Sequence, residues 1–182
     1  MKILFQIPSL NTLSAGRTIY YGYKHAYEDL GHSFRPLTAD DNAERVLKEF
    51  RPDILITSLN SYCLKFLSAE VISKYKKNGG KVFVNIAFWK SPLSRSRINE
   101  VPSISENTEY VSLIASGSYG DVYYNICEQE DPRMDGFEKR TGYPYHTILL
   151  AADKSVLYPE FSQDFAADIS FIGTYLPEKR QF

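Results

Sequence analysis

The chain has 182 residues, with 21 Lys and Arg against 22 Asp and Glu, for a formal net charge of −1. This length fits one domain, or one domain and part of another, and the 43% of hydrophobic residues excludes a disordered chain, a collagen or a coiled coil. The near-zero charge removes the electrostatic argument for nucleic acid or an anionic membrane as a partner.

Short apolar runs alternate with helical segments through the first half of the chain. Strands are predicted over residues 2–7, 33–37, 53–57 and 81–88, and helices between them over residues 18–30, 42–50 and 62–77. Alternation of this kind indicates an α/β fold, a Rossmann-like doubly wound parallel sheet with helices on both faces. Its crossovers are expected to be right-handed.

The second half of the chain is less regular. Residues 89–107 have no period and predict a long loop, which is usually functional in a compact domain. Two further strands are predicted over residues 110–115 and 121–126, a helix from Asp131 to Gly142, and a last strand over residues 147–151. We expect the first strand to be central and to lie beside the fourth, so that the loops after them share one rim of the sheet.

Several common sites are absent from the sequence. The loop after the first strand holds one glycine, Gly16, whereas a dinucleotide-binding loop needs several. Residues 116–120 fail the G-x-S-x-G pattern of a serine hydrolase, and no His or Asp cluster has metal-ligand spacing. His25 lies in the middle of a predicted helix, where we expect an exposed or half-buried ring.

Cellular location is inferred from two features. Cys63 and Cys127 lie far apart in the sequence without a C-x-x-C pair, which predicts buried free thiols in a reducing compartment. No stretch approaches the roughly 20 apolar residues of a membrane span, and the N-terminal apolar run is too short for a signal peptide. We therefore expect a cytoplasmic protein with no transmembrane segment.

A family resemblance rests mainly on the C-terminal third. Residues 150–153 read L-A-A-D, residues 168–175 read D-I-S-F-I-G-T-Y, and Arg180 follows. This series resembles the crossover between the two domains of GT-B glycosyltransferases, and most closely the CgeB-like spore-maturation branch. Two weaker pieces of the N-terminal half agree with it, A-Y-E-D-L-G-H over residues 26–32 and R-P-D over residues 51–53.

The resemblance implies that the chain is one half of a GT-B fold. Residues 1–152 would be the acceptor-side domain, and residues 153–182 a linker with the first strand of a donor domain. The remainder of that domain is expected to be missing or to come from a partner chain, which would leave the fragment inactive. The complete enzyme would move a sugar from a nucleoside-diphosphate sugar to an acceptor hydroxyl without a bound metal. No cofactor is implied, because the nucleotide sugar is a substrate.

Candidate site residues follow from the carboxyl ends of the predicted strands, where open α/β sheets bind ligands. Acceptor-binding candidates are Asn11, Ser14, Gly16, Arg17, Asn60, Trp89, Lys90, Ser118 and Tyr119. Trp89 is either a platform for stacking a sugar or a buried scaffold residue. Asp121 is the candidate general base, or else the cap of a turn after Gly120.

The donor side and an alternative function remain open. Gly173 and Arg180 would lie beneath the donor diphosphate in the family, since Gly admits a close ligand and Arg offers a forked donor. The same stretch could equally be a strand, a turn and a solvated charge run. A non-catalytic Rossmann-like binding module is the alternative to a glycosyltransferase.

Overall fold

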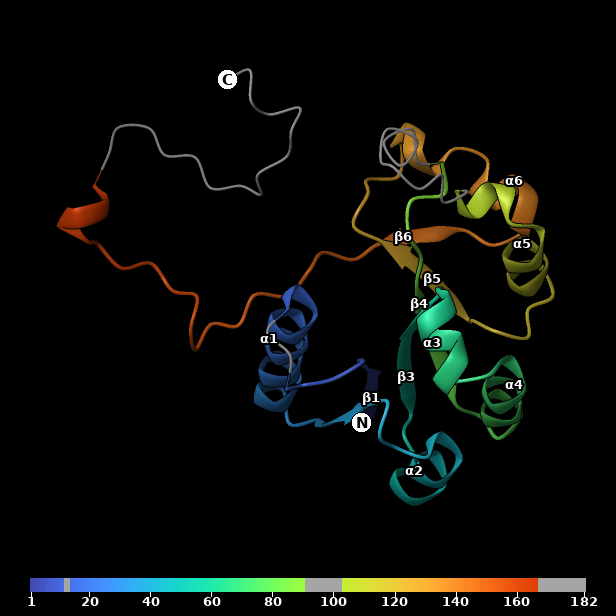
Figure 1. Ribbon diagram of the computed structural model, residues 1–182, viewed down its shortest axis with the longest axis horizontal. Helices are drawn as coiled ribbons and strands as arrows, with labels where there is room; N and C mark the ends of the chain where they lie inside the picture. The colour runs from blue at the N-terminus through green and yellow to red at the C-terminus, as the bar shows by residue number, and fades with distance from the viewer. Residues whose placement is uncertain (12–13, 91–102, 167–182) are drawn as a thin grey trace.

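The computed structural model describes residues 1–11, 14–90 and 103–166 (Figure 1). Six strands form one parallel sheet in the order β2-β1-β3-β4-β5-β6. They are β1 (Lys2–Gln6), β2 (Ser33–Leu37), β3 (Ile54–Ser58), β4 (Lys81–Asn85), β5 (Val122–Asn125) and β6 (Tyr145–Thr147). The predicted Rossmann-like α/β fold with a parallel sheet is confirmed.

In the part of the chain that the structure describes, six α-helices and three short 3-10 helices connect and follow the strands. The α-helices are α1 (Ala15–Asp29), α2 (Ala43–Phe50), α3 (Ser61–Phe66), α4 (Ala69–Lys77), α5 (Thr108–Ala115) and α6 (Phe137–Thr141). The 3-10 helices are η2 (Ile104–Glu106), η3 (Pro132–Met134) and η4 (Gln163–Phe165). Side-chain oxygens cap the start of five α-helices by accepting a backbone N–H, which satisfies an otherwise unpaired donor; they belong to Ser14, Asn42, Asn60, Ser68 and Asn107.

The two faces of the sheet are covered unequally. On one face α1 packs its tyrosines against alternate strand residues such as Ile3 and Phe34. On the other face the helices α2, α4, α5 and α6 bury a larger core around Leu4, Leu55 and Val82, and Figure 1 shows α1 apart from the remaining helices. Each fully buried aliphatic side chain contributes roughly 1.5–3 kcal/mol. Cys63 and Cys127 are buried free thiols, as the sequence predicts.

Five expectations about the elements are wrong. The predicted helix from Asp131 to Gly142 is divided into η3 and α6, because Gly136 between them has a left-handed backbone with φ at 80°. Residues 110–115 belong to helix α5, not to a strand. The predicted helix over residues 62–77 is broken into α3 and α4, because Ser68 caps a new helix. The last strand, β6, ends at Thr147, where the prediction has it begin. Finally, β3 separates β1 from β4, so the loops after β1 and β4 are not neighbours.

Candidate functional site

The chain reverses its direction across the sheet at β1, since β2 lies on one side of β1 and β3 on the other. The helices after β1 and β3 cover opposite faces, so the two loops diverge at the carboxyl edge. In open α/β sheets, ligands bind at this position. Phe5 pairs with Ile56 in the parallel register, so Ser9 and Asn60 leave the sheet at the same edge. We take this edge as the candidate functional site.

Four predicted residues lie at this edge, the exposed Asn11, Ser14 and Asn60 and the half-buried Arg17. The Ser14 hydroxyl accepts the Arg17 N–H at 3.3 Å, and the Asn60 Oδ1 accepts the Cys63 N–H at 2.8 Å. These caps fix the two side chains and leave the amide nitrogen of Asn60 directed elsewhere. The Arg17 guanidinium lies 5.8 Å from the centre of the Tyr21 ring, a cation–π contact that orients it.

Gly16 also lies at this edge, in the first turn of α1. Among the described residues, a Cβ atom at Gly16 would meet the Ser14 hydroxyl alone, at 3.7 Å. The described part of the chain therefore leaves the backbone at Gly16 uncovered. Together with the amide, hydroxyl and guanidinium groups, the N-terminal N–H groups of α1 favour a hydroxylated or anionic ligand.

A buried polar network connects the ends of β1 and β3 next to these loops. Gln6, which ends β1, donates from Nε2 to the Cys63 carbonyl at 3.0 Å and accepts from the Thr57 hydroxyl. Gln6 and Thr57 are 9% and 2% exposed. This network ties the ends of β1 and β3 to the first turn of α3, so it holds the two loops in one geometry. Sequence analysis does not identify it.

Lys90 lies at the carboxyl edge as predicted, but it follows β4, which β3 separates from β1. Its backbone N–H donates to the Arg133 carbonyl at 2.7 Å, and its Nζ lies 3.6 Å from Asp135. Arg133 stacks on Phe88 at 4.2 Å and forms a bidentate pair with Asp131. Hydrogen bonds from Arg133 hold the pKa of Asp131 well below its usual range. Because these charges are already paired, they serve mainly to join the loops after β4 and β5.

Trp89 does not form the sugar platform that the sequence suggests. The side chain is 1% exposed, and its ring meets Phe137 edge-on at 5.2 Å. The Arg140 guanidinium lies over the ring at 5.5 Å. No face of the indole is open to a ligand, so Trp89 is a scaffold residue of the core under α6.

Ser118, Tyr119 and Asp121 lie at the opposite, amino edge of the sheet. They precede β5, because α5 is a helix that carries the chain from one edge to the other. The Asp121 carboxylate accepts the Val82 N–H at 2.8 Å and lies 3.4 Å from Lys76 Nζ. Tyr119 is fully buried. The expectation that these three residues lie at the carboxyl edge is therefore wrong, and their predicted roles in acceptor binding and base catalysis lose that basis.

Replacing Asp121 should affect stability. Asp121→Ala leaves the Val82 N–H without its acceptor and removes the counter-charge of the half-buried Lys76 ammonium, which keeps the Gly117 and Gly120 carbonyls. The free energy of unfolding should therefore fall by about 1–3 kcal/mol. Urea denaturation measures the change. Asp135→Ala, which removes an exposed partner of Lys90, is the matched control and should change stability by less than about 0.5 kcal/mol. Equal effects of the two substitutions would contradict an anchoring role for Asp121.

A groove of about 1000 Å³ lies between α2 and α4 at the amino edge. The charged residues that line it are of both signs, Glu44 and Asp53 against Arg45, Lys48, Arg51 and Lys74. Three of the four cations, Lys48, Arg51 and Lys74, lie in or just after the last turns of the two helices, where cations compensate the unpaired carbonyls and the negative end of the helix dipole. The charge of this groove is explained by the helices and does not indicate a ligand.

No protein-family model matches the chain, and no curated protein matches it. Gly173 and Arg180, the predicted donor-binding residues, lie outside the described residues. Within residues 1–11, 14–90 and 103–166, no helix is long and apolar enough to cross a membrane. Function is therefore inferred from the carboxyl edge between β1 and β3.

Proposed function

We propose that residues 1–152 are the acceptor-side domain of a nucleotide-sugar-dependent glycosyltransferase, and that the acceptor binds at the carboxyl edge between β1 and β3. One observation carries the proposal: exposed amide and hydroxyl groups and the half-buried Arg17 guanidinium lie on capped, hydrogen-bonded loops at the point where the strand order reverses. Such groups suit the hydroxyls of a sugar or an acidic sugar derivative. The family resemblance of residues 150–175 supports the same function.

In this reaction the acceptor oxygen forms a bond to the sugar carbon, and the bond from that carbon to the nucleoside diphosphate breaks. The acceptor proton passes to a base, and the leaving diphosphate takes the negative charge. Residues 8–17 and 59–62 contain no carboxylate or imidazole. We therefore assign to the loops after β1 and β3 the binding and orientation of the acceptor, and place the base on another segment.

Binding measurements on the chain itself test the proposal. Calorimetry should detect binding of members of a panel of mono- and oligosaccharides and sugar phosphates. A panel of uridine, guanosine and thymidine diphosphosugars should give no heat, because the nucleotide would bind the donor domain. Backbone amide shifts should place the saccharide at Asn11, Gly16 and Asn60. Micromolar binding of a nucleotide sugar at this edge would reverse the assignment, and no saccharide binding would favour the non-catalytic binding module.

Arg17→Ala should weaken binding of the best saccharide or sugar phosphate by about 10-fold to 100-fold, the usual effect of losing a hydrogen bond from a charged donor. Arg17 is half-buried, and its guanidinium contacts the Tyr21 ring on the same helix, so the free energy of unfolding should fall by less than about 1 kcal/mol. Lys77→Ala removes an exposed cation at the amino edge and should leave the affinity unchanged. If both variants bind as the natural chain does, the site does not lie at α1.

A further inference from the structure

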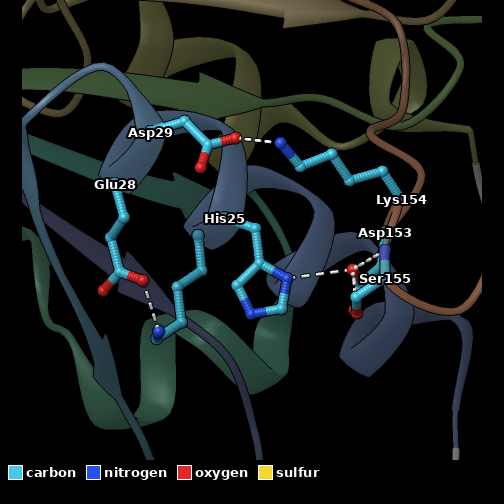
Figure 2. A network of polar contacts seen from close by, with 7 residues as sticks. His25, Glu28, Asp29, Asp153, Lys154 and Ser155 are labelled. Carbon is cyan, nitrogen blue, oxygen red and sulfur yellow. Dashed lines mark hydrogen bonds and ion pairs between the residues drawn. The ribbon is translucent and has the colours of Figure 1, made fainter.

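Residues 148–155, which we call the strap, lie along helix α1 after the chain leaves β6. The Tyr23 hydroxyl donates to the Leu149 carbonyl at 2.7 Å, and Lys154 pairs with Asp29. Between these contacts, Gly22 faces the backbone of Ala151. Figure 2 shows the central contact, in which His25 of α1 points at Asp153 of the strap. Several turns of one helix thus hold a segment more than a hundred residues away in the sequence.

The side chain of Asp153 is the centre of these contacts. Its Oδ1 lies 2.9 Å from His25 Nδ1, 2.7 Å from the Ser155 hydroxyl and 3.0 Å from the Ser155 N–H. An ionised carboxylate only accepts hydrogen bonds, so His25 Nδ1 carries the proton and donates it. The Asp153 side chain is 8% exposed and that of His25 is 33% exposed. Asp153 is therefore a largely desolvated anion with three donors.

Asp153 also shapes the turn that follows. Its backbone carbonyl accepts the N–H groups of Val156 and Leu157 at 3.1 Å and 2.8 Å. Among the described residues, 158–161 form no hydrogen bond or ion pair with the domain, and Phe161 is 80% exposed. Figure 1 shows this part of the chain continuing away from the domain beyond α1. Up to residue 166, the last polar contacts of the chain with α1 are thus those of Asp153 and Lys154.

We propose that the strap sets the direction in which the chain leaves the domain, and that the contact between His25 and Asp153 is a proton-dependent latch on the strap. The proposal does not depend on the proposed glycosyltransferase function. It concerns a contact that the chain forms by itself, on α1 rather than at the carboxyl edge.

The charges around His25 determine the sign of the pH effect. Lys24 is paired with Glu28 at 2.6 Å on the same helix, and Asp29 is paired with Lys154 of the strap. The Tyr21 ring contacts the imidazole at 5.9 Å and is uncharged near neutral pH. Asp153 is thus the charge that directly faces the imidazole.

Hydrogen bonds to the Asp153 carboxylate, first from the Ser155 hydroxyl and amide and then from His25, lower its pKa to about 2. Asp153 is therefore negative from about pH 4 upward. Histidine is the side chain whose charge ordinarily changes between pH 5 and pH 8. The attraction between the two charges is present at pH 5.5 and lost at pH 8, where a neutral hydrogen bond remains. The strap should be held more tightly at the lower pH.

Hydrogen exchange of the whole chain tests the latch. The protection factors of the Ser155, Val156 and Leu157 amides, corrected for intrinsic exchange at each pH, should be about threefold to fivefold higher at pH 5.5 than at pH 8, the effect of a partly exposed ion pair. His25→Gln keeps a donor but has no charge to lose, so it should abolish this difference. His146→Gln, which changes an exposed histidine of β6, should preserve it.

Asp153→Asn tests the strap itself. The variant loses the anionic acceptor of three hydrogen bonds, so the same amides should lose protection by about tenfold at both pH values. Unchanged protection in Asp153→Asn would contradict the proposal that Asp153 holds the strap on α1. The proton-dependent latch would be contradicted if amide protection in the wild-type chain were the same at both pH values. It would also be contradicted if His25→Gln kept the difference.

Discussion

Trp89→Ala should lower the free energy of unfolding by about 3–5 kcal/mol, the usual effect of deleting a large buried aromatic side chain. The indole is 1% exposed and packs against Phe137, whose own ring is equally buried. A domain of this size has only about 5–15 kcal/mol of stability in total. The variant should therefore unfold at a much lower urea concentration, or fail to accumulate as a folded protein.

Two further variants separate packing from ligand binding at this position. Trp89→Phe retains an aromatic ring, so it should recover part of the lost stability. Lys90→Ala changes the exposed neighbour and should shift the unfolding free energy by less than about 0.5 kcal/mol. A Trp89→Ala chain of normal stability with weakened saccharide binding would instead restore the stacking platform that the sequence suggested.

The strands on either side of the switch point were predictable because their signals are local. β1, β2, β3 and β4 are short apolar runs between clear helix caps and stops, and each was placed within a few residues. The order β2-β1-β3 requires only right-handed crossovers with helices on both faces. Consequently Ser14, Arg17 and Asn60 were assigned to the correct edge of the sheet.

The wrong prediction of a strand over residues 110–115 also placed Ser118, Tyr119 and Asp121 at the wrong edge of the sheet. Residues 110–115 form an apolar run that resembles a strand, but Asn107 accepts the Tyr110 N–H at 3.1 Å and begins a helix. A helix in place of a strand returns the chain to the amino edge before β5. Asp121 therefore precedes a strand instead of following one, and it anchors Val82 where a base was expected.

The contacts that stabilise the site and the strap have no local signal. Gln6 and Thr57 are 51 residues apart, and His25 and Asp153 are 128 residues apart. A polar residue in a strand or a histidine in a helix looks the same in the sequence whether or not such a partner exists. Only the tertiary structure identifies these contacts, because the two partners of each lie in elements that are far apart in the sequence.

Two glycines of α1 lie in opposite surroundings and offer a direct test of the strap. A Cβ atom on Gly22 would lie 2.8 Å from the backbone carbon and oxygen of Ala151, closer than real Cβ contacts come. Among the described residues, a Cβ atom on Gly16 would meet only a hydroxyl oxygen, at 3.7 Å. In a bare helix, both substitutions by alanine would be favourable by up to about 1 kcal/mol, because glycine is the poorer helix former.

Gly22→Ala should instead lower the free energy of unfolding by about 1–3 kcal/mol, the effect of overpacking a contact in which a backbone segment must move. Gly16→Ala should leave stability unchanged or raise it by up to about 1 kcal/mol. Urea denaturation of both variants measures this difference of sign. In Gly22→Ala the Val156 and Leu157 amides should also exchange faster, because displacing Ala151 pulls Asp153 away from His25. A stabilised Gly22→Ala chain with normal protection of these amides would show that the strap does not rest on α1 in solution.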